Sequence, residues 1–178
     1  MATDFSALST KVEKYEQILA NTQSYRKAWD TSIKQKIRDF IQSFIDETDI
    51  AGDIEIRNNL KNLESVIFTL GVEPSGIFEP VSDQFRKQLY KSNGMLVFQQ
   101  LYNGKIIVMI AYPHIEEVAK PKQPKTLEII RPEELTDEFM LRYLDTFLTE
   151  IIEWEDYDDD LPQTIGFNKP FQENGLVI

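Results

Sequence analysis

The chain has no cysteine and only one histidine. Without cysteine there are no disulfide bonds, thiolate nucleophiles or cysteine-ligated zinc and iron–sulfur sites. The single histidine, His114, follows an apolar run and cannot by itself form a metal site with several histidine ligands. We interpret it as an ordinary surface or loop residue. The alternative is a catalytic base at a strand end, but no Gly-x-Ser-x-Gly nucleophile elbow accompanies it.

Glycine-rich phosphate-binding loops are also missing. None of the seven glycines forms a Gly-x-Gly-x-x-Gly or Walker-type run, so no nucleotide cofactor is indicated. No metal-binding motif is complete either, and we expect neither a cofactor nor a metal. With no recognisable catalytic motif, a non-enzymatic protein is the favoured interpretation.

Positive charge and long apolar runs are scarce. Nineteen Lys and Arg face thirty Asp and Glu, which gives a net charge of −11. Nucleic acids and anionic membranes both attract cationic surfaces, so neither is an expected partner. The longest apolar run, residues 106–111, is far shorter than the ~20 residues that cross a bilayer. The N-terminus lacks a signal-peptide pattern, and we expect a soluble, cytoplasmic protein.

Apolar spacing predicts two N-terminal helices. The first carries a stripe at alternating steps of three and four residues: Phe5, Leu8, Val12, Tyr15 and Leu19. The second spans about residues 24–47, and its wider stripe predicts packing on a globular core: Trp29, Ile33, Ile37, Phe40, Ile41, Phe44 and Ile45. Residues 21–24 favour a helical hairpin, because Asn and Ser suit helix ends. One continuous rod is the alternative, since Thr22 and Arg26 keep the stripe in phase.

The middle of the chain predicts an antiparallel sheet. Ile54 and Ile56 alternate with polar residues, residues 66–70 form a short apolar run, and residues 71–80 predict a loop. Asn93-Gly94 and Asn103-Gly104 are typical of tight hairpin turns. They predict a meander of three strands, residues 85–91, 95–101 and 105–112, of which the last is expected to be central and covered on both faces. Residues 126–130 predict a further strand.

A long C-terminal helix is predicted from about residue 136 to residue 154, with Thr136 as its N-cap. Its apolar face comprises Met140, Leu144, Phe147, Leu148 and Ile151. We therefore predict an α+β fold with two N-terminal helices, a five- or six-stranded meander-type antiparallel sheet and a C-terminal helix on one face. The chain is interpreted as one domain, with a helical segment (1–49), the sheet plus C-terminal helix (50–161) and an extended tail (162–178). The end of this tail, residues 175–178, is a candidate edge strand.

The acidic run at the end of this helix is the most unusual feature. Residues 150–160 contain seven carboxylates and no Lys or Arg, and so carry −7 of the net charge. Carboxylates are disfavoured at a helix C-terminus, where the dipole is negative. A solvated loop is the simplest interpretation. A cation site is a weaker one, because Leu161, Pro162 and Phe167 break the calcium-loop pattern that Asp156, Asp158 and Asp160 begin.

The functional hypothesis is a protein-interaction module of the adaptor, chaperone-like or inhibitor type, whose acidic patch docks a basic protein partner. The candidate partner-binding residues form one continuous segment: Glu153, Trp154, Glu155, Asp156, Tyr157, Asp158, Asp159 and Asp160. The alternative is a small-ligand sensor or enzyme with a pocket between sheet and helices, lined by tyrosines such as Tyr102, Tyr112 and Tyr143. The oligomeric state stays open, because the N-terminal stripe suits either a dimer seam or an intramolecular hairpin.

Overall fold

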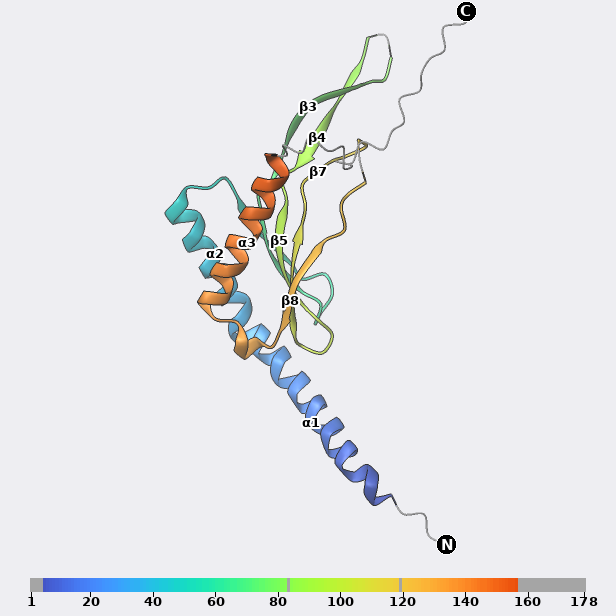
Figure 1. The fold of residues 1–178 in the computed structure, drawn as a ribbon, viewed down its shortest axis with the longest axis vertical. Helices are drawn as coiled ribbons and strands as arrows, with labels where there is room; N and C mark the ends of the chain where they lie inside the picture. Colours follow the sequence, from blue (N-terminus) through green and yellow to red (C-terminus); the bar gives the residue numbers. More distant parts are fainter. Residues whose placement is uncertain (1–4, 83, 119, 157–178) are drawn as a thin grey trace, which may run out of the picture.

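A computed structural model of the chain describes residues 5–156 except 83 and 119 (Figure 1). It contains two joined N-terminal helices, a five-stranded antiparallel sheet, a second sheet of three strands and a C-terminal helix. The predicted α+β class is confirmed. The predicted tail, residues 162–178, with its candidate edge strand, lies outside the described residues.

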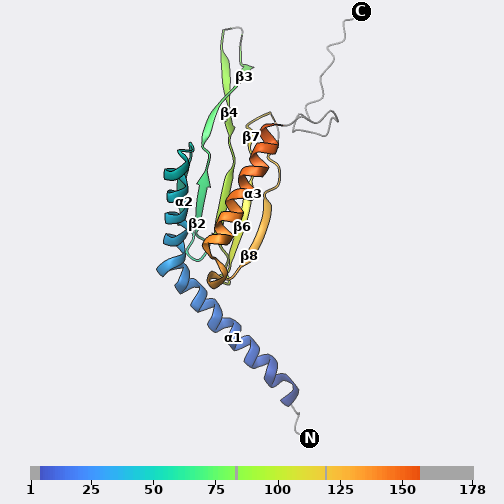
Figure 2. The ribbon, with the colours of Figure 1, turned by 60° about the vertical axis from the view of Figure 1, so that its left-hand side comes forward.

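The N-terminal segment is one continuous helical path. Helix α1 (Ser6–Ala28) passes through a five-residue π-helical turn (Trp29–Ile33) into α2 (Lys34–Thr48). The predicted hairpin is wrong, because residues 21–24 continue the helix instead of ending it. The path bends near the π-helical turn, as local changes in helical hydrogen bonding commonly cause (Figures 1 and 2). Trp29 and Ile33 are buried there, so the bend lies where the helix enters the core.

A small polar network holds this bend against the sheet. Trp29 Nε1 donates a hydrogen bond to Glu64 Oε2 (3.2 Å), and Lys34 Nζ forms a salt bridge with the same oxygen. The hydrogen bond from Lys34, helped by that from Trp29, holds the pKa of Glu64 below its ordinary value despite partial burial. The indole donor of the buried tryptophan is therefore satisfied by a carboxylate that keeps its charge.

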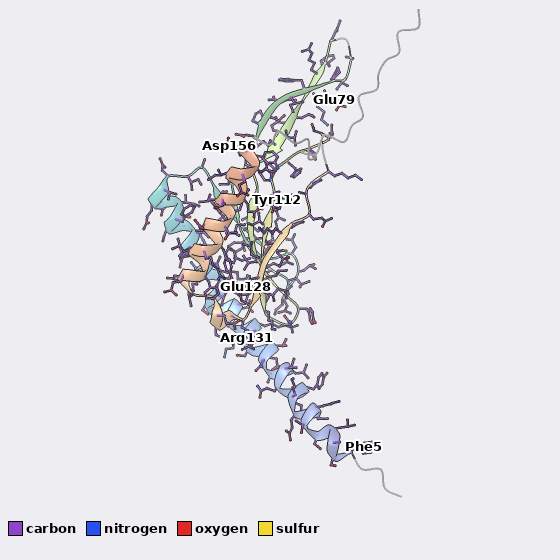
Figure 3. All side chains as sticks on the ribbon, viewed as in Figure 1. Phe5, Glu79, Tyr112, Glu128, Arg131 and Asp156 are labelled. Carbon is purple, nitrogen blue, oxygen red and sulfur yellow. The ribbon has the colours of Figure 1, made fainter. Side chains whose placement is uncertain are left out.

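The two predicted apolar stripes have different environments. In α2, Ile37 and Ile41 are buried and Phe40, Phe44 and Ile45 pack against the core, as predicted. In α1 no residue is buried, and the stripe from Phe5 to Leu19 faces solvent. Helix α1 leaves the core as a rod, with Phe5 near its free end (Figure 3). Regular spacing thus marks an apolar face in both helices, but only one of these faces is covered by the described chain.

The main sheet supplies the other half of the core. Its strand order is β1-β2-β5-β6-β8, and each neighbouring pair is antiparallel. The strands are β1 (Asp53–Arg57), β2 (Ser65–Thr69), β5 (Met95–Gln100), β6 (Ile106–Ala111) and β8 (Lys125–Ile130). In β6 the alternate residues Ile106, Val108 and Ile110 are fully buried, whereas Ile107 and Met109 remain partly exposed. The expectation that this strand is fully covered on both faces is therefore wrong, because the helices lie on one face only (Figure 2).

A second sheet projects from one end of the first. It contains β3 (Val72–Pro80), β4 (Arg86–Ser92) and the short β7 (His114–Ile115), in the order β3-β4-β7. The β3–β4 hairpin extends beyond the core and is called the β3–β4 arm below (Figures 1 and 2). The prediction of a loop at residues 71–80 is wrong. Most of these residues form the edge strand β3, which pairs with β4 and is interrupted by a bulge.

The predicted tight turn at Asn93-Gly94 is also wrong, because the chain does not reverse there. Strand β2 runs on into β3 and β4 runs on into β5, so the two strands pass together from one sheet to the other. Leu70 N donates to Gly94 O (3.1 Å) and Asn93 N donates to Gly71 O (3.0 Å) across this junction. Gly71 and Gly94 have φ values of 80° and 97°, so their positive φ angles serve a bend in a paired ribbon.

The second Asn-Gly pair does form the predicted hairpin turn between β5 and β6. Gly104 N donates to Leu101 O (2.8 Å), and Leu101 N donates to Lys105 O (2.7 Å). Gly104 has a φ of 77°, whereas Asn103 is not among the residues with positive φ. The loop is therefore longer than the two-residue turn that the sequence suggested.

Helix α3 (Asp137–Glu155) follows a short 3-10 turn (Pro132–Glu134) and closes the core. Thr136 caps it as predicted, since its hydroxyl oxygen accepts a hydrogen bond from Phe139 N (3.4 Å). Its buried residues are Met140, Tyr143, Leu144, Phe147 and Ile151. Phe68 of the sheet lies edge-on between Phe44 of α2 and Phe147 of α3, with ring centroids 5.8 and 5.7 Å away. These rings join both helices to the sheet.

Candidate functional site

The predicted partner-binding segment begins in the last turn of α3. Glu153, Glu155 and Asp156 are exposed there and Trp154 is half-buried. Tyr157, Asp158, Asp159 and Asp160 lie outside the described residues. Asp156 lies at the end of α3 nearest to the β3–β4 arm, on which Glu79 is found (Figure 3). The described part of the segment is thus placed beside the base of the arm.

A lysine of the arm neutralises part of this segment. Lys91 Nζ lies 2.7 Å from Glu155 Oε1 and 3.2 Å from Glu73 Oε1, and it lies 5.6 Å from the centroid of the Trp154 ring. Burial opposes the charge of Lys91, but hydrogen bonds to the two glutamates outweigh it and raise the pKa of the lysine. Lys91 therefore stays charged and ties the end of α3 to β4.

A second lysine neutralises the start of the acidic run. Glu150 forms a salt bridge with Lys125 and accepts a hydrogen bond from Tyr112 Oη (2.6 Å). The bond from Lys125, followed by that from Tyr112, lowers the pKa of Glu150 against the effect of burial. Burial and the contact with Glu150 raise the pKa of Tyr112, and Lys122 Nζ lies 3.7 Å from its ring centroid. The two lysines that form these salt bridges, Lys91 and Lys125, lie in strands β4 and β8, 64 and 25 residues before the glutamates that they pair with.

These pairings reduce the acidic surface that the sequence suggested. Of the four described carboxylates in the run, Glu150 and Glu155 are paired within the chain. Glu153 and Asp156 have no salt bridge to any of the described residues. The exposed carboxylates without a salt bridge in the described part of the segment are therefore Glu153 and Asp156, beside the half-buried ring of Trp154.

The β3–β4 arm carries a feature that the sequence analysis missed, an exposed apolar face. Pairing across the arm places Val72, Pro74, Phe78 and Pro80 of β3 opposite Ser92, Tyr90, Gln88 and Arg86 of β4. Directly opposed residues point to the same side of a sheet, so Val72, Phe78 and Tyr90 share one face. Their side chains are 67%, 52% and 51% exposed, and Phe85 near the tip is 71% exposed. The opposite face carries the charged residues Glu73, Lys91, Glu79 and Lys87.

The sequence contained a weak signal for this face. Residues 85–91 were predicted as a strand, but its partner was hidden by Pro74, Gly76 and Pro80, which usually mark loops. Prolines are tolerated here because β3 is an edge strand with a bulge between Pro74 and Phe78. Only the paired register reveals that the apolar residues of the two strands lie on one side.

The tyrosines proposed to line a pocket are distributed differently. Tyr112 and Tyr143 are buried, and each hydroxyl hydrogen-bonds to a carboxylate, Glu150 and Glu128 respectively (2.6 and 2.7 Å). Tyr102 is 74% exposed on the β5–β6 turn. The space between sheet and helices is filled by large side chains that are fully buried: Trp29, Phe68, Phe98 and Phe147. Tyr112 and Tyr143 are therefore part of the core, whereas Tyr102 lies on the surface.

An open depression of about 350 Å³ lies between the end of α3 and the bend from β2 into β3. Its lining includes Leu70, Ile151, Glu73, Lys91 and Asn93. Asn93 Oδ1 is buried and has no hydrogen-bond partner among the described residues. This depression is where the alternative hypothesis, a small-ligand sensor, has a candidate location.

His114 begins β7, where it pairs with Ser92 of β4, and it is half-buried. Within the described chain no three His, Cys, Asp or Glu side chains gather as a metal site would require.

Among the described helices, none combines the length and apolar character that a membrane crossing needs.

Comparisons with known protein families, with curated proteins and with solved structures gave no match.

Proposed function

We propose that the protein is a non-enzymatic protein-interaction module of the adaptor, chaperone-like or inhibitor type. The observation that carries this proposal is the β3–β4 arm, which projects from the core and presents Val72, Phe78 and Tyr90 to solvent on one face. Exposed apolar patches with aromatic residues are typical of protein-binding surfaces. Aromatic anchors usually supply most of the binding free energy.

The acidic segment at the end of α3 gives this surface an electrostatic component. Glu155 contacts Lys91 at the base of the arm, so the segment and the arm form one region. We propose that Glu153, Trp154, Glu155, Asp156, Tyr157, Asp158, Asp159 and Asp160 favour a basic protein partner there. Complementary charge at the edge of an apolar patch speeds association and selects partners more than it adds affinity.

A pull-down from native lysate, quantified by mass spectrometry, tests the arm. Tyr90→Ser is compared with Tyr102→Ser, since both tyrosines are exposed and only the first lies on the arm. Loss of one aromatic anchor costs about 2 kcal/mol, or roughly thirtyfold in affinity. Tyr90→Ser should therefore lose partners that Tyr102→Ser retains. Equal recovery with both variants would contradict a role for the arm.

The acidic component is tested separately. The variant Glu153→Gln/Asp156→Asn is compared with Glu47→Gln/Asp145→Asn, which removes the same two charges elsewhere. The first variant should reduce recovery of basic partners at low salt, and the difference should vanish at high salt as charges are screened. If the two variants recover the same partners at both salt concentrations, the α3 end is not part of the docking surface.

A further inference from the structure

Helix α1 presents an apolar seam that the rest of the described chain does not cover. The seam comprises Leu8, Val12, Tyr15 and Leu19, preceded by Phe5 next to the helix, and these side chains are 46–65% exposed. The contacts of α1 with the core lie at its last turns, where Gly104 approaches Thr22, Tyr25 and Arg26. The seam therefore lies beyond the core along its whole length (Figures 1 and 2).

The spacing of the seam is that of a coiled coil. Steps of three and four alternate from Phe5 to Leu19, so the apolar residues occupy the a and d positions of a heptad repeat. In this frame Phe5, Val12 and Leu19 are a residues and Leu8 and Tyr15 are d residues. Helices in proteins gain most of their stability by packing an apolar face against another element, which α1 does not do within the described chain.

The charges beside the seam favour a second copy of the same helix as the occupant. Lys11 takes position g and Glu16 takes position e of the following heptad, and neither has a salt bridge to another described residue. In a parallel two-stranded coiled coil, residue g of one helix faces residue e of the next heptad in the other helix. Two copies would therefore form two symmetric Lys11–Glu16 pairs across the seam, with no like-charged pair opposing them.

We propose that α1 mediates dimerisation of this protein through a parallel coiled coil formed by Phe5–Leu19 of two chains. Thr22 and Arg26, the next residues of the heptad frame, are polar and lie beside the β5–β6 turn, so the seam ends at Leu19. The β3–β4 arm and the end of α3 are at the opposite end of the molecule and remain free in such a dimer (Figure 3). The dimer thus carries two copies of the proposed docking surface.

Sedimentation velocity of the full chain over the micromolar range tests this proposal. The wild-type protein should be dimeric, and Val12→Glu/Leu19→Glu should be monomeric because it places charges in the seam. The matched control, Thr10→Glu/Gln17→Glu, adds the same charge with the same spacing on the opposite face of α1 and should remain dimeric. The cooperative urea transition of the core should be alike for both variants, because no residue of α1 is buried among the residues that the structure describes. A monomeric wild type, or a dimer that persists in the seam variant, would overturn the proposal.

Charge reversal tests the parallel register. Lys11→Glu and Glu16→Lys should each weaken the dimer several-fold, since each creates two like-charged pairs by symmetry. The double variant Lys11→Glu/Glu16→Lys restores opposite charges and should recover the wild-type dissociation constant. Failure of the double variant to recover would rule out the parallel arrangement.

Discussion

Phe68 joins both helices to the sheet, and its removal should be among the most costly single changes in the core. Its side chain is fully buried, and its ring makes edge-to-face contacts with Phe44 and Phe147. Truncating a buried phenylalanine to alanine generally lowers the free energy of unfolding by about 3–5 kcal/mol. We expect Phe68→Ala to fall in this range, because the two packed rings leave the cavity little room to collapse.

The measurement is urea denaturation followed by circular dichroism, with thermal melting as a second readout. For a domain of this size each kcal/mol lowers the melting temperature by about 2–4 °C, so Phe68→Ala should lose about 6–20 °C. Phe85→Ala is the matched control, since it makes the same change at a side chain that is 71% exposed. It should stay within about 0.5 kcal/mol of wild type. A loss below about 1 kcal/mol for Phe68→Ala would refute the inferred packing of α2 and α3 on the sheet.

Two further predictions concern a glycine and the paired carboxylates. Gly104→Ala should destabilise the protein more than Gly76→Ala in urea denaturation. Both glycines have a φ near 75°, but a Cβ at position 104 would lie 2.6 Å from Tyr25 Cβ, whereas a Cβ at position 76 would meet open space. Equal losses in the free energy of unfolding would contradict the docking of α1 on the β5–β6 turn. Glu64 and Glu150 both have a lowered pKa, so their stabilisation is present above the unfolded pKa and is lost as the pH falls through the folded one, starting near 4.5. The urea midpoint should therefore decrease below this pH, and less steeply in Glu64→Gln/Glu150→Gln; parallel curves for wild type and variant would contradict this assignment.

Local patterns predicted the parts of the fold in which local and tertiary preferences agree. The α2 stripe and the Thr136 cap occur as predicted, and the β5–β6 hairpin forms with a longer loop than expected. The buried face of α3 contains the predicted Met140, Leu144, Phe147 and Ile151, with Tyr143 in addition. In each case the apolar periodicity or the turn-forming residues of a short segment favour the same local structure that the tertiary packing requires.

The failures arise where one local signal serves two structures. Asn-Gly supplies a positive φ both in the turn at Gly104 and in the bend at Gly94, and the sequence does not distinguish reversal from continuation. The stripe of α1 marks an apolar face without specifying what covers it, and the hairpin that Asn21 and Ser24 favoured does not form, because these residues lie inside the helix. Strand β3 was hidden because an edge strand tolerates the prolines that usually mark loops.

The acidic run shows most clearly why the candidate site could be predicted only in part. Its carboxylates violate the preference of a helix C-terminus for cations, which suggested an external cation or basic partner. The fold instead supplies Lys91, 64 residues before Glu155, and Lys125, 25 residues before Glu150. A lysine that pairs with one carboxylate offsets the helix dipole and neutralises the charge of that carboxylate, even where the side chain stays partly exposed as in Glu155. The proposed recognition of a basic partner would therefore rely mainly on the carboxylates that these two lysines leave unpaired, and within the described segment those are Glu153 and Asp156.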